Sequence, residues 1–391
     1  MSALLQDPAL FRLLLVLSVG VAFAVYTRLH LVGGGSVTGG YVAILVVTGS
    51  WGTLLGTTVV ALLAVAIMRG LVLRVLGLPR NWQFTLSVLV GAILTGVLAA
   101  LVPPWISLGG PLGLAMTFGA FVIPGLLAYD ISHQGFPQTM LALALVTVVT
   151  LAVCVPIFLL LSGLPQAAAT DAPFVQRIPT GLMPFAVIAA IVIGAVLRFS
   201  FGLRSGGFIG ALFIVEFFSP EAFLTVGIAA LVTHGLMLAI ESRVVLTMRQ
   251  RAMVALMLGA LVAWAGLYWA SAFDWLPAQE ANLYALSPLL ATGLMAADMG
   301  RPAGRPGDPA GMGRDVLRTL LGTRIAALAL AALLWVTDTV GLLAGVALLA
   351  VIALGVIPGV LSLREPWAAA ERSGKERLAE LGRGPGQPPP A

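Results

Sequence analysis

The chain has 391 residues, of which 60% are hydrophobic and only 9% charged, and its mean hydropathy is +1.05. Soluble domains carry about a quarter charged residues, so this composition excludes an ordinary water-soluble fold and predicts an all-α, polytopic integral membrane protein. The net charge of +5 would suggest nucleic acid as a partner in a soluble chain. Here the basic residues lie in short loops beside apolar spans, so we expect the lipid bilayer as partner and no nucleic acid.

Apolar segments follow one another along the whole chain, and they predict about 12–13 transmembrane or re-entrant helices. The second and eighth segments contain only about 12–15 apolar residues, fewer than the roughly 20 that cross a bilayer. Such short segments are typical of broken or re-entrant helices. The thirteen segments are centred near residues 17, 43, 60, 93, 120, 150, 190, 213, 231, 261, 289, 327 and 350.

The arginines predict the orientation. If all thirteen segments cross and the N-terminus lies outside, then only Arg12 and Arg177 of the 21 basic residues fall outside the cytoplasmic side. This asymmetry is the positive-inside rule at nearly full strength. We therefore expect a multi-pass protein of the cell membrane with a cytoplasmic C-terminus.

The sequence also contains an internal repeat. Residues 39–45 are similar to residues 206–212, Arg80 recurs as Arg249, and residues 125–130 recur as residues 293–298, all at offsets of 167–169. Each unit holds six apolar segments, an even number, so both units enter the membrane in the same direction and the symmetry axis runs along the membrane normal. The expected divisions are a first repeat (1–163), an external linker (164–181), a diverged second repeat (182–336), an extra transmembrane helix (337–363) and a partly disordered cytoplasmic tail (364–391).

Several kinds of chemistry are excluded by what the sequence lacks. Lys375 is the only lysine, and no Walker A motif surrounds it, so the chain has no P-loop for ATP. One cysteine, Cys154, and three histidines give no convincing spacing for a zinc cluster or a catalytic triad. We therefore expect no cofactor, no metal and no catalytic residues, and a self-contained hydrolase is unsupported.

The first candidate site is a glycine cluster that recurs in the second unit. Glycines break a helix and expose backbone amides, so a re-entrant turn here could meet a carboxylate or phosphate, helped by Arg204. Close helix packing by small residues explains the same cluster, and the sequence leaves both interpretations open. The residues are Gly33, Gly34, Gly35, Gly39 and Gly40, with Gly206 and Gly207 in the second unit.

The second candidate site follows the Pro124–Gly125 pair. Asp130 and His133 are one helical turn apart, next to Gln134, and together they could relay a proton or contact a polar substrate. Alternatively, Asp130 merely ends its helix in water. Asp298 repeats Asp130, but His133 has no counterpart and Thr292 replaces Pro124, so we expect Asp130 to matter more than Asp298.

Two further groups carry charge. Glu216 lies within an apolar stretch beside the second glycine cluster, where an acid usually faces a bundle interior, whereas we expect Glu241 to pair with Arg243. The arginine loops set topology, and they are also candidates for docking an acidic partner or anionic lipid. Their candidate docking residues are Arg69, Arg74, Arg80, Arg243, Arg249 and Arg251.

Over residues 10–163 the sequence resembles the membrane subunit of the poly-gamma-glutamate synthase (capsule biosynthesis) complex. The resemblance rests on three stretches: the glycine-rich segment 33–45, the arginine loop that ends at Arg80 and leads into residues 89–92, and residues 123–135. The second unit looks like a diverged second copy, with Gly300–Gly313 inserted after Asp298. The whole chain then resembles two tandem copies of that subunit.

The resemblance implies a function in poly-gamma-glutamate synthesis and export. In that family the membrane subunit works with a separate, soluble, ATP-dependent amide ligase, which would be the partner here, alongside further membrane or export subunits. This chain would then be non-catalytic alone and would hold the ligase at the membrane. A different class remains open: a self-sufficient secondary transporter or exporter of an anionic small molecule, with Glu216 or Asp130 as the coupling acid.

Overall fold

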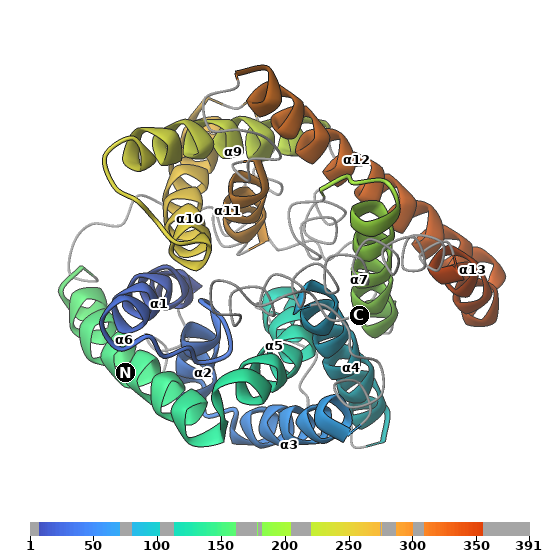
Figure 1. The fold of residues 1–391 in the computed structure, drawn as a ribbon, viewed down its shortest axis with the longest axis horizontal. Helices are drawn as coiled ribbons and strands as arrows, with labels where there is room; N and C mark the ends of the chain where they lie inside the picture. Colours follow the sequence, from blue (N-terminus) through green and yellow to red (C-terminus); the bar gives the residue numbers. More distant parts are fainter. Residues whose placement is uncertain are drawn as a thin grey trace, which may run out of the picture.

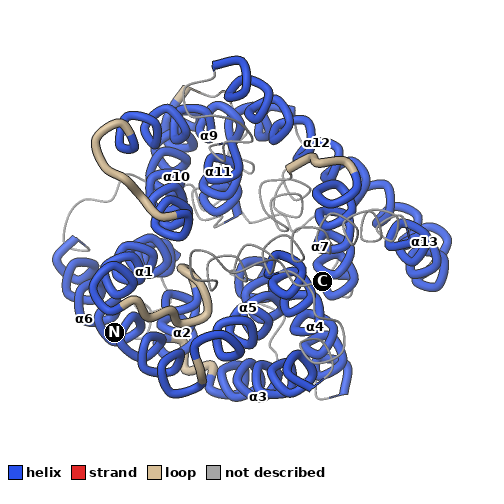
Figure 2. The backbone as a smooth tube through the Cα atoms, in the orientation of Figure 1, coloured by secondary structure: helices blue, strands red, loops and turns tan. Residues whose placement is uncertain are grey.

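The structure, a computed structural model, describes residues 8–70, 80–101, 113–161, 178, 182–204, 220–273, 275, 287–299 and 309–354. These residues form α-helices, with π-helical geometry at 68–70, and no strand occurs among them (Figure 2). Eight of the helices are long and apolar enough to cross a membrane. The prediction of an all-α, multi-pass membrane protein is confirmed.

Twelve of the thirteen predicted segments correspond to described helices, and the eighth, near residue 213, lies outside the described residues. We call α1–α6 the first unit and α7–α12 the second unit. The first unit contains α1 (Pro8–Leu29), α2 (Thr38–Val47), α3 (Trp51–Ile67), α4 (Arg80–Leu101), α5 (Gly113–Gln134) and α6 (Phe136–Leu161). The second contains α7 (Met183–Ser200), α9 (Pro220–Glu241), α10 (Met248–Ala272), α11 (Ser287–Met299) and α12 (Pro309–Val340), after which α13 (Leu342–Leu354) follows.

Two of the short connections depend on glycine. Gly135 separates α5 from α6 with φ 96°, and Gly341 separates α12 from α13 with φ 115°. Both values lie in the left-handed region that side chains with a Cβ disfavour, so glycine ends one helix and lets the next begin at once. α2 has only 10 residues, about 15 Å at 1.5 Å per residue, and it is half as long as a full crossing.

The two units have the same internal packing. In the first unit α4 packs against α5, α3 against both, and α1 against α6; in the second, α10 packs against α11, α9 against both, and α7 against α12. Figure 1 shows counterpart helices on opposite sides of the centre, so that a half-turn brings α3 near α9 and α6 near α12. This arrangement supports the repeat hypothesis.

The glycines at the closest helix crossing of each unit recur at the offset of the sequence repeat. A Cβ on Gly91 of α4 would lie 2.4 Å from the backbone nitrogen of Gly125 in α5. In the second unit, a Cβ on Gly259 of α10 would lie 2.5 Å from the Cα of Gly293 in α11. Each glycine of the second pair lies 168 residues after its counterpart, and in both units only glycine permits this close approach of two helices.

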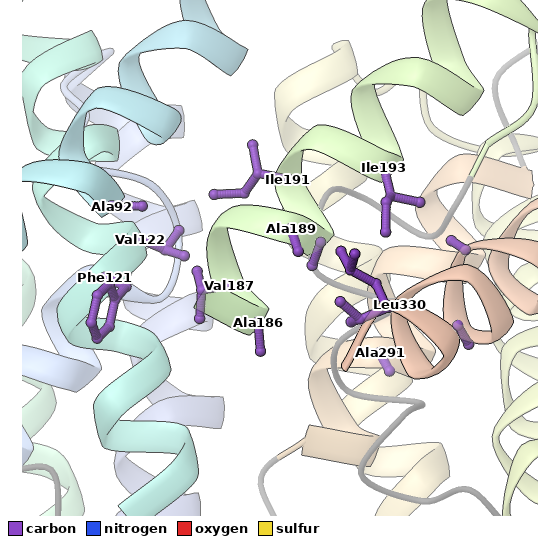
Figure 3. Close-up of a cluster of buried hydrophobic side chains, with 14 of the residues drawn as sticks. Ala92, Phe121, Val122, Ala186, Val187, Ala189, Ile191, Ile193, Ala291 and Leu330 are labelled. Carbon is purple, nitrogen blue, oxygen red and sulfur yellow. The ribbon is translucent and has the colours of Figure 1, made fainter. Parts of the chain in front are cut away.

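The largest buried cluster is centred on α7 and joins the two units (Figure 3). Val187 and Ile191 of α7 lie toward Val122 of α5, and Ile193 lies toward Leu330 of α12. A second seam joins α1 to α10, where Val19 packs with Leu256. Both of these clusters are apolar, so packing supplies much of the contact between the units.

Replacing Gly125 with alanine is expected to lower the free energy of unfolding by about 1–3 kcal/mol, because the added Cβ would lie 2.4 Å from the Cα of Val88. The matched control is Gly235→Ala in α9, where a Cβ meets nothing within 4 Å and alanine should be neutral or slightly stabilising. The readout is Tm in detergent, followed by fluorescence-detected size-exclusion chromatography. Equal Tm values for the two variants would contradict the assignment of a glycine crossing.

Candidate functional site

The glycine cluster forms a turn between α1 and α2. Gly34 and Gly35 have φ values of 79° and 91°, which glycine adopts at little cost. The turn also lies close to its neighbours: a Cβ on Gly33 would lie 2.6 Å from the backbone nitrogen of Leu143 in α6, and one on Gly34 would lie 2.5 Å from the Leu127 side chain in α5. We call residues 30–37 the glycine turn.

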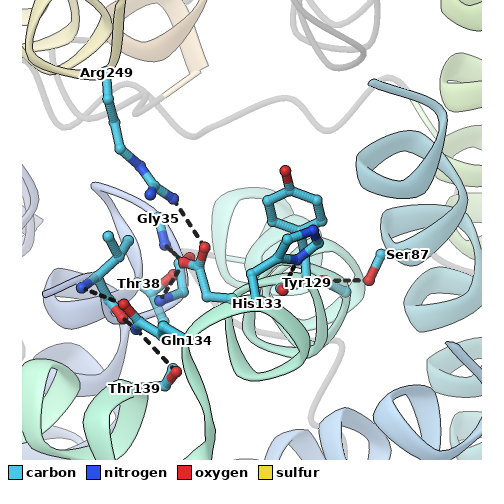
Figure 4. Close-up of polar contacts among 12 residues, drawn as sticks. Gly35, Thr38, Ser87, Tyr129, His133, Gln134, Thr139 and Arg249 are labelled. Atoms are coloured by element: carbon cyan, nitrogen blue, oxygen red, sulfur yellow. Dashed lines mark hydrogen bonds and ion pairs between the residues drawn. The ribbon is translucent and has the colours of Figure 1, made fainter. Parts of the chain in front are cut away.

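Asp130 of α5 binds the amides of this turn (Figure 4). Its side chain is buried, and Oδ2 accepts hydrogen bonds from the backbone N–H of Gly34 at 3.0 Å and of Gly35 at 3.2 Å. Its other oxygen, Oδ1, accepts from the Arg249 guanidinium at 2.8 Å and forms an ion pair with it. The exposed amides predicted from the glycines are therefore bound by a carboxylate of the chain itself.

Gln134, one turn further along α5, holds the start of the same turn. Its side-chain oxygen accepts from the backbone N–H of Val32 at 3.2 Å, and its side-chain nitrogen donates to the carbonyl of Val32. The same nitrogen donates to the Thr139 hydroxyl at 2.9 Å, while the Thr38 hydroxyl donates to the carbonyl of Gly34. Asp130 and Gln134 thus fix the turn at two points.

His133 has different partners from Asp130. Its Nδ1 contacts the carbonyl of Tyr129 at 2.8 Å, and its Nε2 contacts Oε1 of Gln83 at 3.1 Å on the exposed side of α5. The histidine ring also lies 4.3 Å from the Tyr129 ring, centroid to centroid. Although the two residues are one turn apart, the described contacts do not join them, so a direct Asp130/His133 relay gains no support.

Pro124 lies inside α5, which continues through it. Proline has no N–H, so the carbonyl of Ala120 loses its helical partner, and the Thr95 hydroxyl of α4 donates to that carbonyl at 3.2 Å. Ser87 of α4 likewise donates to the carbonyl of Gly125 at 2.8 Å. These contacts give the Pro124–Gly125 pair a role in the α4–α5 crossing, one turn and a half before Asp130.

Arg249, expected only as a docking residue, belongs to the Asp130 site. Its side chain is 39% exposed, and its guanidinium carbon lies 5.7 Å from the centroid of the Tyr26 ring. Arg69 has a related place, since its Nη2 donates to the carbonyl of Ile131 at 2.9 Å, near the end of α5. A cation at the C-terminal end of a helix complements the helix dipole.

The other predicted docking arginines differ in their surroundings. Arg243 is exposed, and Arg251 pairs with Glu241 at 2.6 Å between Nε and Oε1. The expected Glu241–Arg243 pair is therefore wrong; Arg251, at the start of α10, reaches the end of α9 instead. Arg74 and the side chain of Arg80 lie outside the described residues.

The second unit holds its corresponding region differently. Nη1 of Arg204 donates to the backbone carbonyl of Asp298 at 2.7 Å and lies 3.8 Å from Oδ2 of Asp315. A Cβ on Gly322 of α12 would lie 2.2 Å from the carbonyl oxygen of Arg204, so that residue's backbone lies directly against α12. Gly206, Gly207 and Glu216, three of the predicted site residues, lie outside the described residues.

Among the described residues, no three His, Cys, Asp or Glu side chains are grouped so that they could hold a metal ion. The arrangement is instead an anchored turn: a carboxylate with three hydrogen-bond donors, two from the backbone and one from a guanidinium. Hydrogen bonds to a charged group are stronger than neutral ones, so Asp130 can hold the turn and the second unit together.

Comparison with protein families shows that residues 17–140 match the family described as capsule biosynthesis CapC. The match lies within the first unit and covers less than half of the chain, so residues 17–140 are similar to this family. The matched range contains the glycine turn, Asp130 and Gln134, but it ends long before Arg249. Comparisons with curated proteins and with solved structures give no match. The match supports a role in capsule biosynthesis, and the eight long apolar helices indicate a multi-pass membrane protein.

Replacing Asp130 with asparagine is expected to lower the free energy of unfolding by about 2 kcal/mol, because the amide keeps one acceptor for the turn but loses the charge that Arg249 pairs with. Polymer output in a capsule-producing host should fall as well. Asp338→Asn, an exposed aspartate near the end of α12, is the control and should change neither.

The same assay compares the two units. Asp298→Asn is expected to reduce polymer output less than Asp130→Asn, because the first unit keeps the Pro124–Gly125 pair and the CapC match. An equal or greater loss from Asp298→Asn would refute this ranking.

Proposed function

We propose that the chain is the integral-membrane subunit of a complex that makes and exports poly-gamma-glutamate, acting with a separate ATP-dependent amide ligase. The observation that carries this proposal is the CapC match, because residues 17–140 include the glycine turn and the carboxylate that binds it. The CapC match supports a role in capsule synthesis, and the resemblance of residues 33–45 and 123–135 to the poly-gamma-glutamate synthase subunit is the basis for proposing the glutamate polymer and the ligase.

The charges at one end of the bundle support an anionic polymer or an acidic partner. Arg69 follows α3 and Arg249 lies in the first turn of α10, and both contact α5 near its C-terminal end, at Ile131 and Asp130. Arg251 lies in the same first turn of α10. Arg249 donates one hydrogen bond to Asp130, and its side chain remains 39% exposed. Guanidinium groups bind carboxylates through paired donors, which suits a polymer of glutamate.

The division of labour with a ligase fits the residues of this chain. With a single lysine and no Walker A motif, the sequence offers no P-loop for ATP, whereas an amide ligase that activates a carboxylate consumes ATP. We infer that the ligase supplies the covalent chemistry, and that the membrane subunit holds it at the bilayer and receives the growing chain. The positive-inside rule would place the arginine-rich end in the cytoplasm, where the ligase is.

A secondary transporter is the competing function, and the half-turn arrangement of the two units favours it as a second candidate, because many transporters are built from two repeats. The two functions differ in what the purified chain does alone. A transporter should move an anionic substrate in liposomes without any partner.

The first experiment is purification from native membranes in mild detergent, with mass spectrometry and an assay for ATP-dependent glutamate polymerisation. We expect an amide ligase to co-elute and the complex to form polymer. A chain that purifies without a ligase and transports glutamate in liposomes would overturn the synthase proposal in favour of the transporter.

Ligase docking can be tested at Arg243, whose side chain is exposed beyond the end of α9. Arg243→Glu should weaken ligase capture roughly tenfold at low salt, and the difference should shrink at high salt because exposed charges are screened. Thr339→Glu, near the end of α12, introduces a negative charge at another exposed position and should leave capture unchanged. Equal effects of both variants would argue against a specific arginine surface.

A further inference from the structure

The contacts between the two units come in reciprocal pairs. α1 of the first unit packs against α10 of the second, and α7, the counterpart of α1, packs against α4, the counterpart of α10. Individual residues show the same reciprocity. Val19 packs with Leu256 in the α1–α10 seam. Their counterparts at an offset of 168, Val187 and Val88, both belong to the buried cluster of the α4–α7 seam. Reciprocal contacts of this kind characterise an interface with two-fold symmetry.

Polar and aromatic contacts close both seams near the same helix ends. In the α1–α10 seam, the Gln250 side chain donates to the Thr27 hydroxyl at 3.3 Å, beside the contact of Arg249 with Tyr26. In the α4–α7 seam, the Trp82 ring stacks on the Phe199 ring at 3.8 Å between centroids. Position 82 is 168 residues before position 250, so counterpart positions at the starts of α4 and α10 make the cross-unit contact in both seams.

Electrostatics require a cation at Asp130. The carboxylate is 4% exposed, and the two amides of the glycine turn stabilise its charge without neutralising it. A buried carboxylate that lacks a counter-charge is strongly unfavourable, and Asp130 forms its ion pair with Arg249, 119 residues away in the other unit. The CapC-matched segment therefore holds the turn and the acid, and the second unit supplies the counter-charge.

We propose that the two units pack against each other as the two subunits of a two-fold symmetric dimer do. The second unit then completes the glycine-turn site of the first through Arg249. Arg249 is then a positioning residue, which holds Asp130 and through it the amides of Gly34 and Gly35. The second unit has a definite role in this scheme even where its own sequence has diverged. The partner that the first unit requires is a second copy of the same fold, fused in one chain.

The pairing can be tested by cross-linking in the full-length chain. In a Cys154→Ser background, Thr27→Cys and Gln250→Cys place thiols on α1 and α10, and a protease site inserted after residue 165 allows the units to be separated afterwards. A short bis-thiol reagent should keep the two halves in one band after cleavage. The control pair, Thr27→Cys with Thr339→Cys, should not. A folded, monodisperse chain in which the first pair also fails to cross-link would overturn the pairing.

The role of Arg249 is tested by the reactivity of the turn. With Ser36→Cys in the Cys154→Ser background, Arg249→Gln should raise the rate of maleimide labelling roughly tenfold, because the turn loses its counter-charged anchor. Arg249→Lys should restore part of the protection. Arg251→Gln is the matched control, since Arg251 lies two residues away and pairs with Glu241 of its own unit. Equal labelling in the Arg249→Gln and Arg251→Gln chains would refute the role.

A double-mutant cycle gives an independent result. Asp130→Asn and Arg249→Gln together should lower Tm no further than the worse single variant, whereas Asp130→Asn with Arg251→Gln should be additive. Additive losses for Asp130 and Arg249 would contradict the coupling. None of these measurements requires polymer, so failure of the proposed poly-gamma-glutamate function and failure of this pairing would be distinguishable.

Discussion

A carboxylate inside a membrane bundle must be neutralised and hydrogen-bonded, and the arrangement around Asp130 follows from that requirement. One oxygen takes the two amides that the glycine turn exposes, and the other takes Arg249. The turn needs Gly34 and Gly35 because both adopt positive φ, and its amides need an acceptor because a buried backbone N–H without a partner is costly. A single acid therefore links an irregular backbone segment of the first unit to a cation of the second.

A second constraint acts on α5, the helix that carries Asp130: its backbone lies directly against that of α4, where only glycine leaves enough space. Gly91 and Gly125 let α4 and α5 meet at the backbone, and Pro124 frees the carbonyl of Ala120, which Thr95 then satisfies. The carbonyl group that Pro124 leaves without a helical partner therefore accepts a hydrogen bond from a side chain of the facing helix α4. Since Asp130 lies five residues after Gly125, this crossing fixes where the acid stands relative to the turn.

Sequence patterns were sufficient for whatever depends on local composition or on repetition. The apolar segments predicted the described helices, and the glycines and the recurrent aspartate were predicted as candidate site residues, which the fold brings together at Asp130. The pairing of Asp130 with Arg249 could not be predicted, because it joins residues 119 positions apart through the packing of α1 on α10. Gln134 was predicted as part of the site, but its bonds to Val32 depend on the path of the turn. Glu241 was assigned to its neighbour Arg243, whereas the fold brings Arg251 closer.

The ends of α5 and α11, which are counterparts in the two units, are stabilised by arginines of different origin. In the first unit a carboxylate binds the turn and an arginine arrives from the other unit. In the second, Arg204 of the corresponding segment donates to the backbone carbonyl of Asp298 and lies near Asp315 of α12, so a cation from its own unit reaches the same helix end. Thr292 stands where the first unit has Pro124, so the need for a donor like Thr95 disappears there. Because Arg204 of the second unit already reaches the end of α11, Arg249 is left to pair with Asp130 of the first unit.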